Sequence, residues 1–219
     1  CTIADIRAYR PDSNSISSGQ VLQEPYDWHK AKLIVREMTD LLVLDLVKKR
    51  LCTDQLTLTI GYDIENLSDP ARAAEYAGET HVDRYGRRVP KHGHGTANLA
   101  GYSSSTREIT DAVMALYDRI TDKNLLVRRV TVAANRVLPE NKIPHAAESG
   151  EQMDLFSAAE ENPGAPGAEQ KARERERRRQ EAILAIQRRY GSNAILKGMN
   201  LEEGATTRER NKQIGGHRA

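Results

Sequence analysis

The sequence predicts an α+β domain with a split βαβ arrangement, in which a four-stranded antiparallel sheet carries two helices on one face. Two observations predict this fold class. Stretches with an apolar residue at every second position are interleaved with stretches whose apolar residues recur every three or four positions. Over residues 13–138, these stretches follow one another in the order strand, helix, strand, strand, helix, strand.

The first half of the predicted domain begins with a strand and a long helix. Residues 13–22 form a serine-rich strand with a candidate bulge at Gly19, and Pro25 ends it. Asp27 is a suitable N-cap for a helix that continues to about residue 51, because a carboxylate accepts hydrogen bonds from the free amides of a first helical turn. One stripe of this helix is apolar and contains Ala31, Ile34, Val35, Met38, Leu41, Leu42 and Leu46.

The second strand, over residues 55–63, alternates cleanly and therefore has one polar face. Its apolar face carries Leu56, Leu58, Ile60 and Tyr62. The opposite face carries Thr57, Thr59 and Gly61. Residues 64–93 then interrupt the pattern as a weakly ordered insertion, rich in alanine and glutamate at first and basic near its end.

A third strand, a second helix and a fourth strand complete the predicted sheet. Residues 95–103 form a weak strand, and Ser105 or Thr106 caps a helix that continues to Thr121. The apolar stripe of this helix contains Ile109, Val113, Leu116, Tyr117 and Ile120. The last strand covers residues 125–138, with Val130, Val132 and Ala134 on one face and Arg129, Thr131, Ala133 and Asn135 on the other.

Composition limits the class of protein. Of the 219 residues, 29% are charged and 38% are hydrophobic, so part of the chain should lie outside a packed core. No stretch is long and apolar enough to cross a membrane, and we expect no signal peptide. The two cysteines, Cys1 and Cys52, have neither disulfide nor metal-site spacing, which predicts reduced thiols in the cytoplasm.

The chain divides into four parts, and it begins at a cysteine rather than a methionine, so we expect a piece of a longer protein. Residues 1–12 have the pattern of the end of a preceding element. The predicted domain, residues 13–138, is followed by an acidic linker without periodicity over residues 139–169. Residues 170–219 hold thirteen basic and six acidic residues and form a charged helical tail.

The face of the predicted sheet that lies away from the helices carries serine, threonine, asparagine and arginine and almost no carboxylates. Hydroxyl groups, amides and guanidinium groups are the donors that bind the phosphates of nucleic acids. The pattern favours a nucleic-acid contact, and a merely solvated sheet face remains the alternative.

A short motif stands out in the linker. Phe156 is the only phenylalanine of the chain, and it follows Gln152, Met153, Asp154 and Leu155 between two segments rich in proline, alanine and glutamate. Such a segment cannot bury two large apolar side chains by itself, so the pair either fills a pocket of another protein or folds back onto this chain.

With these features together, residues 13–138 resemble the little finger domain of a Y-family (lesion-bypass) DNA polymerase. The best match is the bacterial branch similar to DNA polymerase IV and UmuC. Residues 1–12 resemble the end of the thumb and the tether that precede this domain, and residues 193–218 resemble the C-terminal end of such proteins. The resemblance implies that the sheet lies in the major groove of a template–primer duplex and holds mainly the DNA backbone.

The resemblance also implies particular DNA contacts. Ser15, Ile16 and Ser17 match the phosphate-contacting segment of the first strand, and Arg129 and Thr131 match DNA-facing positions of the last strand. The sequence departs from the pattern at residue 14, where asparagine replaces the basic residue of many members. The other expected DNA contacts are Thr57, Thr59 and Thr96 on the polar face and Arg87, Arg88 and Lys91 in the insertion.

Gln152-Met153-Asp154-Leu155-Phe156 is similar to the motif with which bacterial proteins bind the β sliding clamp. In that motif the Leu-Phe pair fills an apolar pocket and the glutamine forms a hydrogen bond beside it. Met153 stands where leucine is usual, which is a close substitution. A flexible tether of this kind raises the effective concentration of a polymerase on DNA.

The resemblance implies a role in an error-prone, lesion-bypass DNA polymerase of DNA repair and the SOS response, acting on damaged DNA. Such enzymes transfer nucleotides with metal ions, expected to be magnesium, held by palm carboxylates. The resemblance places this palm before the start of the chain, so we expect no catalytic residue, no metal site and no cofactor in this chain. His81, His92 and His94 lack suitably spaced Cys or carboxylate partners for a metal.

Two other hypotheses differ in class. A clamp-binding adaptor would use the domain only as a scaffold and would not bind DNA. An RNA-binding sheet of the same topology would stack bases on paired aromatic side chains, and the polar face of this sheet has none.

Overall fold

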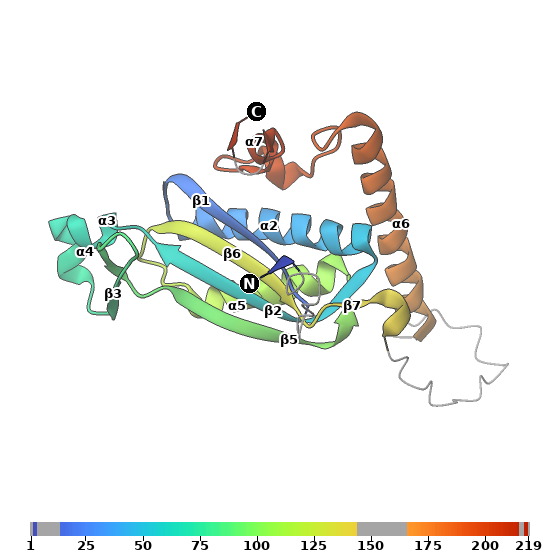
Figure 1. Ribbon diagram of the computed structural model, residues 1–219, viewed down its shortest axis with the longest axis horizontal. Coiled ribbons are helices and arrows are strands. Elements are labelled where there is room, and N and C mark those ends of the chain that lie inside the picture. The colour runs from blue at the N-terminus through green and yellow to red at the C-terminus, as the bar shows by residue number, and fades with distance from the viewer. Residues whose placement is uncertain (1, 4–13, 144–165, 215–216, 219) are drawn as a thin grey trace.

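The computed structural model describes residues 2–3, 14–143, 166–214 and 217–218. Within them, a central antiparallel sheet has the strand order β1-β6-β2-β5 (Figure 1). Its strands are β1 (Ile16–Tyr26), β2 (Leu51–Tyr62), β5 (Gly93–Ser103) and β6 (Val127–Asn135), and the short β7 (Leu138–Pro139) pairs with the start of β2.

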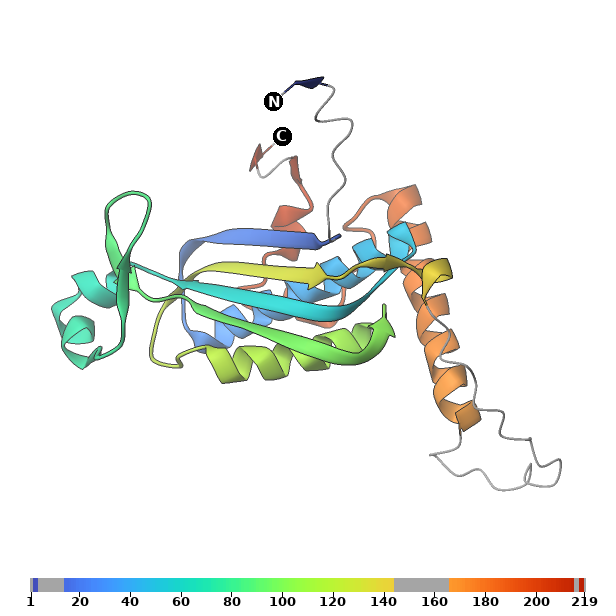
Figure 2. The same cartoon turned by 60° about the horizontal axis from the view of Figure 1, so that its bottom comes forward.

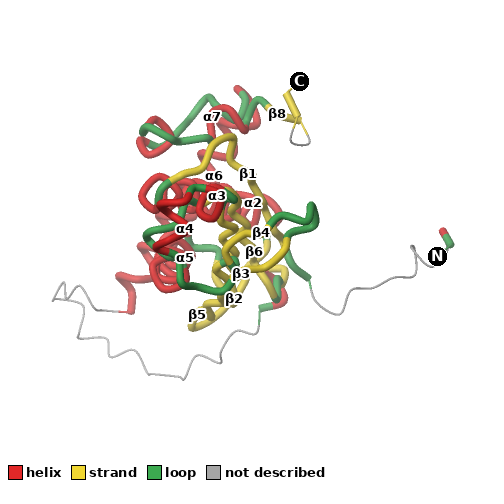
Figure 3. The backbone as a smooth tube through the Cα atoms, turned by 90° about the vertical axis from the view of Figure 1, so that its left-hand side faces the viewer, coloured by secondary structure: helices red, strands yellow, loops and turns green. Residues whose placement is uncertain are grey.

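Two long helices, α2 (Trp28–Lys49) and α5 (Thr106–Ile120), cover one face of the sheet (Figures 1 and 3). The order strand, helix, strand, strand, helix, strand is therefore confirmed, and with it the predicted fold class. Both helices begin at the predicted caps. Asp27 accepts a hydrogen bond from the amide of Lys30, and the side chain of Ser105 accepts one from the amide of Glu108.

The core lies between these helices and the covered face of the sheet. The apolar residues of β2 and β6 that alternate toward the helices are fully buried, as are most of the two predicted helical stripes. Tyr117 of α5 is also buried, and its hydroxyl donates a hydrogen bond to the carbonyl of Trp28 at 2.8 Å. Burial raises the pKa of this hydroxyl, which therefore stays protonated and can donate the hydrogen bond at neutral pH.

The first strand differs from its prediction in two ways. It does not end before Pro25 but continues through it to Tyr26. Pro25 lies in the irregular part of the β1–β6 pairing, between Val21 and Tyr26, where no paired residue of β6 needs its missing N–H. Gly19 is not at a bulge, since it pairs in register with Thr131, and the irregularity lies further on, between Val21 and Tyr26.

The insertion after β2, predicted to be weakly ordered, contains regular structure. It holds α3 (Glu65–Ser68), α4 (Pro70–Glu75) and a hairpin of β3 (Thr80–Val82) and β4 (Arg88–Pro90). Asp69 caps α4, whose first residue is Pro70, a combination that favours a helix start. The buried side chain of Asn66 fixes the insertion to the domain by bonding the backbone amide and carbonyl of Leu126 at 2.8 and 2.9 Å.

Beyond the linker, α6 (Pro166–Tyr190) packs against the end of the sheet where β2 begins (Figures 1 and 2). Arg177 binds both carboxylate oxygens of Glu140, which lies in the short helix η1 (Glu140–Lys142), at 2.7 and 3.2 Å. Glu176 accepts hydrogen bonds from the hydroxyl of Ser105 and the amide of Arg107, so a residue of α6 completes the N-terminal cap of α5.

The tail after α6 returns to α2 and β1. It contains η2 (Gly198–Leu201), α7 (Thr207–Arg210) and a small hairpin of β8 (Gln213–Ile214) and β9 (His217–Arg218). Glu37 of α2 is only 1% exposed, and its carboxylate accepts hydrogen bonds from the Asn200 side chain at 2.8 Å and from the Thr206 amide at 2.7 Å. This buried carboxylate is the central contact of the tail, which is also held by the ion pairs Lys197–Asp40 and Lys30–Glu203.

The helices of the described segments include none that is long and apolar enough to span a lipid bilayer.

We expect Glu37→Ala to release the tail from α2 while the sheet stays folded. The substitution leaves the Asn200 amide group and the Thr206 amide without an acceptor, at about 1–3 kcal/mol for each buried group. Hydrogen exchange read by mass spectrometry should accelerate over residues 197–210 and stay unchanged in β2 and β6. The matched control is Glu24→Ala, which removes an exposed carboxylate of β1. Equal protection of the tail in Glu37→Ala and Glu24→Ala would contradict this account.

Candidate nucleic-acid interface

The face of the sheet opposite α2 and α5 is open, and strand pairing arranges its side chains in rows. Directly paired residues of an antiparallel sheet point to the same side, so the register defines each row. The rows are Gln55, Asn98 and Asn135; then Ser17, Ala133, Thr57 and Thr96; then Gly19, Thr131, Thr59 and His94; and last Val21, Arg129 and Gly61. We call this set the open face.

Hydrogen bonds between neighbouring strands hold the polar side chains of the open face in place. The hydroxyl oxygens of Thr57 and Thr96 lie 3.3 Å apart, and the Asn135 amide donates to the Thr57 hydroxyl at 2.7 Å. The Thr59 hydroxyl lies 2.9 Å from Nδ1 of His94. Each of these groups keeps further hydrogen-bonding capacity, because a hydroxyl has one donor and two acceptor sites.

No carboxylate belongs to the open face among the described residues. The nearest acids lie beside it and are paired: Asp54 with Arg136 at 2.8 Å, and Asp63 with Arg128 at 3.6 Å. Arg129 is exposed, and its guanidinium makes no ion pair or hydrogen bond within the described segments. The face therefore presents neutral donors and acceptors around a free positive charge, a combination suited to phosphate groups.

Gly61 makes room for this arginine. A Cβ atom at that position would lie 3.1 Å from Cβ of Arg129, closer than side chains normally pack. The absent side chain thus leaves the first part of the Arg129 side chain free to lie over β2 at the end of the sheet nearest the insertion.

The sequence comparison decides the family. Residues 13–155 match the C-terminal domain of the impB/mucB/samB family, which is more than half of the chain. The chain belongs to that family. The predicted resemblance to a Y-family little finger domain is thereby confirmed.

Other comparisons are less informative. Among solved structures, the fold is similar to one titled as a complex of the β-clamp processivity factor and the little finger domain of PolIV. The TM-score is 0.36 and the identity 10%, and the match covers 55% of this chain and 86% of that one. No curated protein matches the chain.

The structure brings together most of the DNA contacts predicted for this little finger. Six of them share the open face: Ser17, Thr57, Thr59, Thr96, Arg129 and Thr131. Ser15 is exposed immediately before β1, and Ile16 points to the helix side, where it packs against the core. Only backbone groups of Ile16 are therefore available to a ligand on the open face.

The basic residues of the insertion lie apart from the open face, in and beside the β3–β4 hairpin. Arg87 pairs with Asp83 at 2.7 Å, and Lys91 pairs with Glu79 at 2.5 Å. The Arg88 guanidinium donates a hydrogen bond to the hydroxyl of Thr80 and has no acidic partner in the described part of the chain. Two of the three predicted cations are thus partly neutralised.

Four polar residues of the open face were missed as candidates, namely Gln55, His94, Asn98 and Asn135. Two of them belong to β5, which begins at Gly93 rather than at residue 95 as predicted. Alternation of His94, Thr96 and Asn98 with small or apolar residues is the signal that identifies the face. Gln55 was assigned to the second strand, and its pairing with Asn98 and Asn135 places it on the face.

The predicted clamp motif, Gln152 to Phe156, lies outside the described residues. The residues of the described segments include no group of three or more His, Cys, Asp or Glu side chains that could hold a metal ion. His81, His92 and His94 do lie near one another, with ring centroids 5.6 and 6.2 Å apart. Partial burial, together with the neighbouring histidines and Lys91, lowers the pKa of His92, so this ring is neutral at neutral pH.

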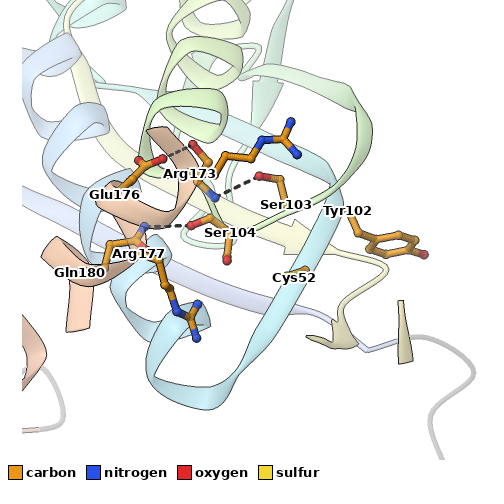
Figure 4. Close-up of a pocket in the computed structure, with 9 residues that line it drawn as sticks. Cys52, Tyr102, Ser103, Ser104, Arg173, Glu176, Arg177 and Gln180 are labelled. Carbon is orange, nitrogen blue, oxygen red and sulfur yellow. Dashed lines mark hydrogen bonds between the residues drawn. The ribbon is translucent and has the colours of Figure 1, made fainter. Parts of the chain in front are cut away.

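A small polar cavity of about 220 Å³ lies where α6 meets the turn between β5 and α5 (Figure 4). Its groups are already bonded to one another, since Gln180 donates hydrogen bonds to the Ser104 carbonyl and the Thr106 hydroxyl, both at 3.0 Å. Burial raises the pKa of the Cys52 thiol beside it, which disfavours the reactive thiolate. The cavity lies at the contact that attaches α6 to the sheet domain.

Proposed function

We propose that this chain is the DNA-binding and clamp-binding part of an error-prone lesion-bypass DNA polymerase of DNA repair and the SOS response. The open face binds the backbone of duplex template–primer DNA, and Gln152 to Phe156 bind the bacterial β sliding clamp. Magnesium and the catalytic carboxylates belong to the palm of the full polymerase, and the described residues of this chain offer no group that would hold the metal.

The observation that carries the DNA-binding proposal is the open face itself: among the described residues it holds no carboxylate, and its Arg129 has no partner. A solvated sheet surface normally mixes both signs of charge, as the helix side of this domain does with its pairs Lys30–Glu203 and Lys32–Asp118. Acids on the open face would repel phosphates, and here the flanking Asp54 and Asp63 are both paired with arginines. This arrangement supports contact with a polyanion.

The shape of the open face favours a duplex. Its side chains are short, and rings able to stack on bases are lacking apart from His94, so it can contact sugar and phosphate groups but does not provide a stacking platform. Such contacts fix position on a duplex without reading sequence, as a polymerase that moves along DNA requires.

The clamp-binding proposal rests on the sequence motif. Leu155 and Phe156 supply apolar anchors, and the segment that holds them follows a folded DNA-binding domain in the same chain. Binding to DNA through the open face and to a clamp through the motif would make the second contact intramolecular, which raises the effective concentration.

For the DNA half, we expect the chain to bind a labelled blunt duplex with an affinity that falls as salt rises. Arg129→Ala should weaken binding by roughly 0.5–1.5 kcal/mol and reduce the salt slope by about one, because one phosphate contact is lost. Fluorescence anisotropy at several salt concentrations measures both quantities. The matched control is Arg36→Ala, which removes an exposed arginine that has no ion-pair partner among the described residues and lies on α2, on the opposite side of the domain.

Equal losses for Arg129→Ala and Arg36→Ala would indicate a general charge effect and contradict the proposed site. Absence of salt-dependent duplex binding by the unaltered chain, together with clamp binding, would favour the clamp-binding adaptor instead.

For the clamp half, we expect the double substitution Leu155→Ala and Phe156→Ala to weaken binding to a bacterial sliding clamp at least about thirtyfold. Each anchor is of the kind whose truncation costs roughly 2 kcal/mol or more at an interface. Calorimetry of the full chain with purified clamp measures the loss, and duplex binding of the same variant should be unchanged. Substitution of the neighbouring pair Glu160 and Glu161 by alanine is the control. Retained clamp affinity in the Leu155 and Phe156 variant would contradict the assignment.

A further inference from the structure

The β3–β4 hairpin stands at one end of the open face and projects to the side away from α2 and α5. Figure 2 shows it rising from the sheet opposite α5, and Figure 3 shows its turn on the far side of the sheet from the helices. Its base is well anchored, since Val89 and Pro90 are buried and Glu79 accepts a backbone hydrogen bond from Lys91 at 2.8 Å. The base of the hairpin is therefore fixed at the edge of the proposed DNA surface.

The turn of this hairpin is held in one conformation by Asp83. The carboxylate of Asp83 accepts hydrogen bonds from the amides of Tyr85 and Arg87 at 2.8 and 3.0 Å, and it also pairs with the Arg87 guanidinium. These donors lower the pKa of Asp83, so the carboxylate is ionised at neutral pH. Gly86 has φ of +78°, a backbone conformation that favours glycine and completes the tight turn.

The fixed turn displays an aromatic ring in contact with two arginines. Tyr85 is 65% exposed, and Val82 on β3 is 66% exposed. The guanidinium carbons of Arg84 and Arg87 lie 4.8 and 5.0 Å from the centroid of the Tyr85 ring. The Tyr85 hydroxyl accepts a hydrogen bond from the Arg84 guanidinium at 2.7 Å, so the exposed ring is held in place and offers an aromatic surface to a partner.

The charge of the hairpin indicates what kind of partner it is. Within the hairpin, Asp83 offsets Arg87 and Glu79 offsets Lys91. Arg84 and Arg88 remain, both exposed, and neither has an acidic partner in the described segments. A ring accompanied by two uncompensated guanidinium groups suits a ligand with both an aromatic face and a negative charge, which is the chemistry of a nucleotide.

We propose that the hairpin tip binds an unpaired nucleotide next to the duplex, with Tyr85 stacking on the base and Arg84 and Arg88 contacting phosphates. The position of this nucleotide rests on the proposed function, in which the duplex occupies the open face. The nucleotide is unpaired because the bases of a duplex are stacked on one another and do not offer a face to a side chain at its edge. The hairpin thus distinguishes a junction between duplex and single strand from a continuous duplex.

The test compares a blunt DNA duplex with the same duplex extended by a short single strand at one end. Fluorescence anisotropy with the full chain gives the affinity for each DNA, for the unaltered chain and for Tyr85→Ala, Tyr85→Phe and Arg129→Ala. Since stacking on one base contributes about 1–3 kcal/mol, Tyr85→Ala should weaken binding to the extended DNA roughly fivefold or more and leave the blunt duplex unchanged. Tyr85→Phe keeps the ring and should retain the affinity. The fluorescence of a 2-aminopurine placed at the first unpaired position should be quenched by the unaltered chain and by Tyr85→Phe. Tyr85→Ala should not quench it.

The outcomes separate this inference from the proposed function. Equal affinities of Tyr85→Ala and the unaltered chain for the extended DNA would overturn the inference, as would an equal loss on both DNAs. Binding of a protein to the hairpin, together with unchanged affinity of Tyr85→Ala for both DNAs, would also overturn the inference. If Arg129→Ala binds both DNAs as tightly as the unaltered chain does, the open-face proposal fails while Tyr85-dependent binding of the single strand still supports the hairpin site.

Discussion

The register of β6 between β1 and β2 is the constraint on which the rest of the structure depends. Side chains alternate along a strand, so a shift of one residue would exchange the two faces of the sheet. In the observed register, Val130 and Val132 meet Ile60 and Leu58 in the core. The same register places Thr131 beside Thr59 on the open face. Burial of the apolar set therefore fixes the polar set, and the proposed DNA surface is a consequence of core packing.

Additional elements are attached to both ends of the sheet, the insertion at one end and α6 at the other. At one end, buried hydrogen bonds of Asn66 fix the insertion, so its hairpin is held beside the end of the open face. At the other end, Arg177 and Glu176 attach α6 to η1 and to the start of α5. The tail after α6 then packs on the helix side through Glu37. Arg177 and Glu176 of α6 thus bind the domain itself. Neither α6 nor the tail covers the open face.

Features that depend on a local residue pattern could be predicted from the sequence, and features that depend on contacts between distant residues could not. Alternation in β2 and β6 predicted the fold and most of the open face, because each face of a half-buried strand has its own composition. The early start of β5 was missed, because Gly93 and Gly95 interrupt the alternation around His94. Glu37 looked like any charged residue of a long helix, since its partners lie more than 160 residues away in the chain. The hairpin was predicted as a basic stretch, but the ring at its tip becomes meaningful only once its direction relative to the sheet is known.

Threonine methyl groups offer the most direct test of the central claim that the open face binds duplex DNA. They lie on both sides of the domain: Thr57, Thr59, Thr96 and Thr131 on the open face, and Thr39 and Thr110 on the helices. With the full chain labelled at threonine methyl carbons, addition of a blunt duplex should shift the NMR signals of the first four. The signals of Thr39 and Thr110 should stay in place. Shifts confined to the helix threonines, or no shift of the open-face threonines at saturating DNA, would contradict the account.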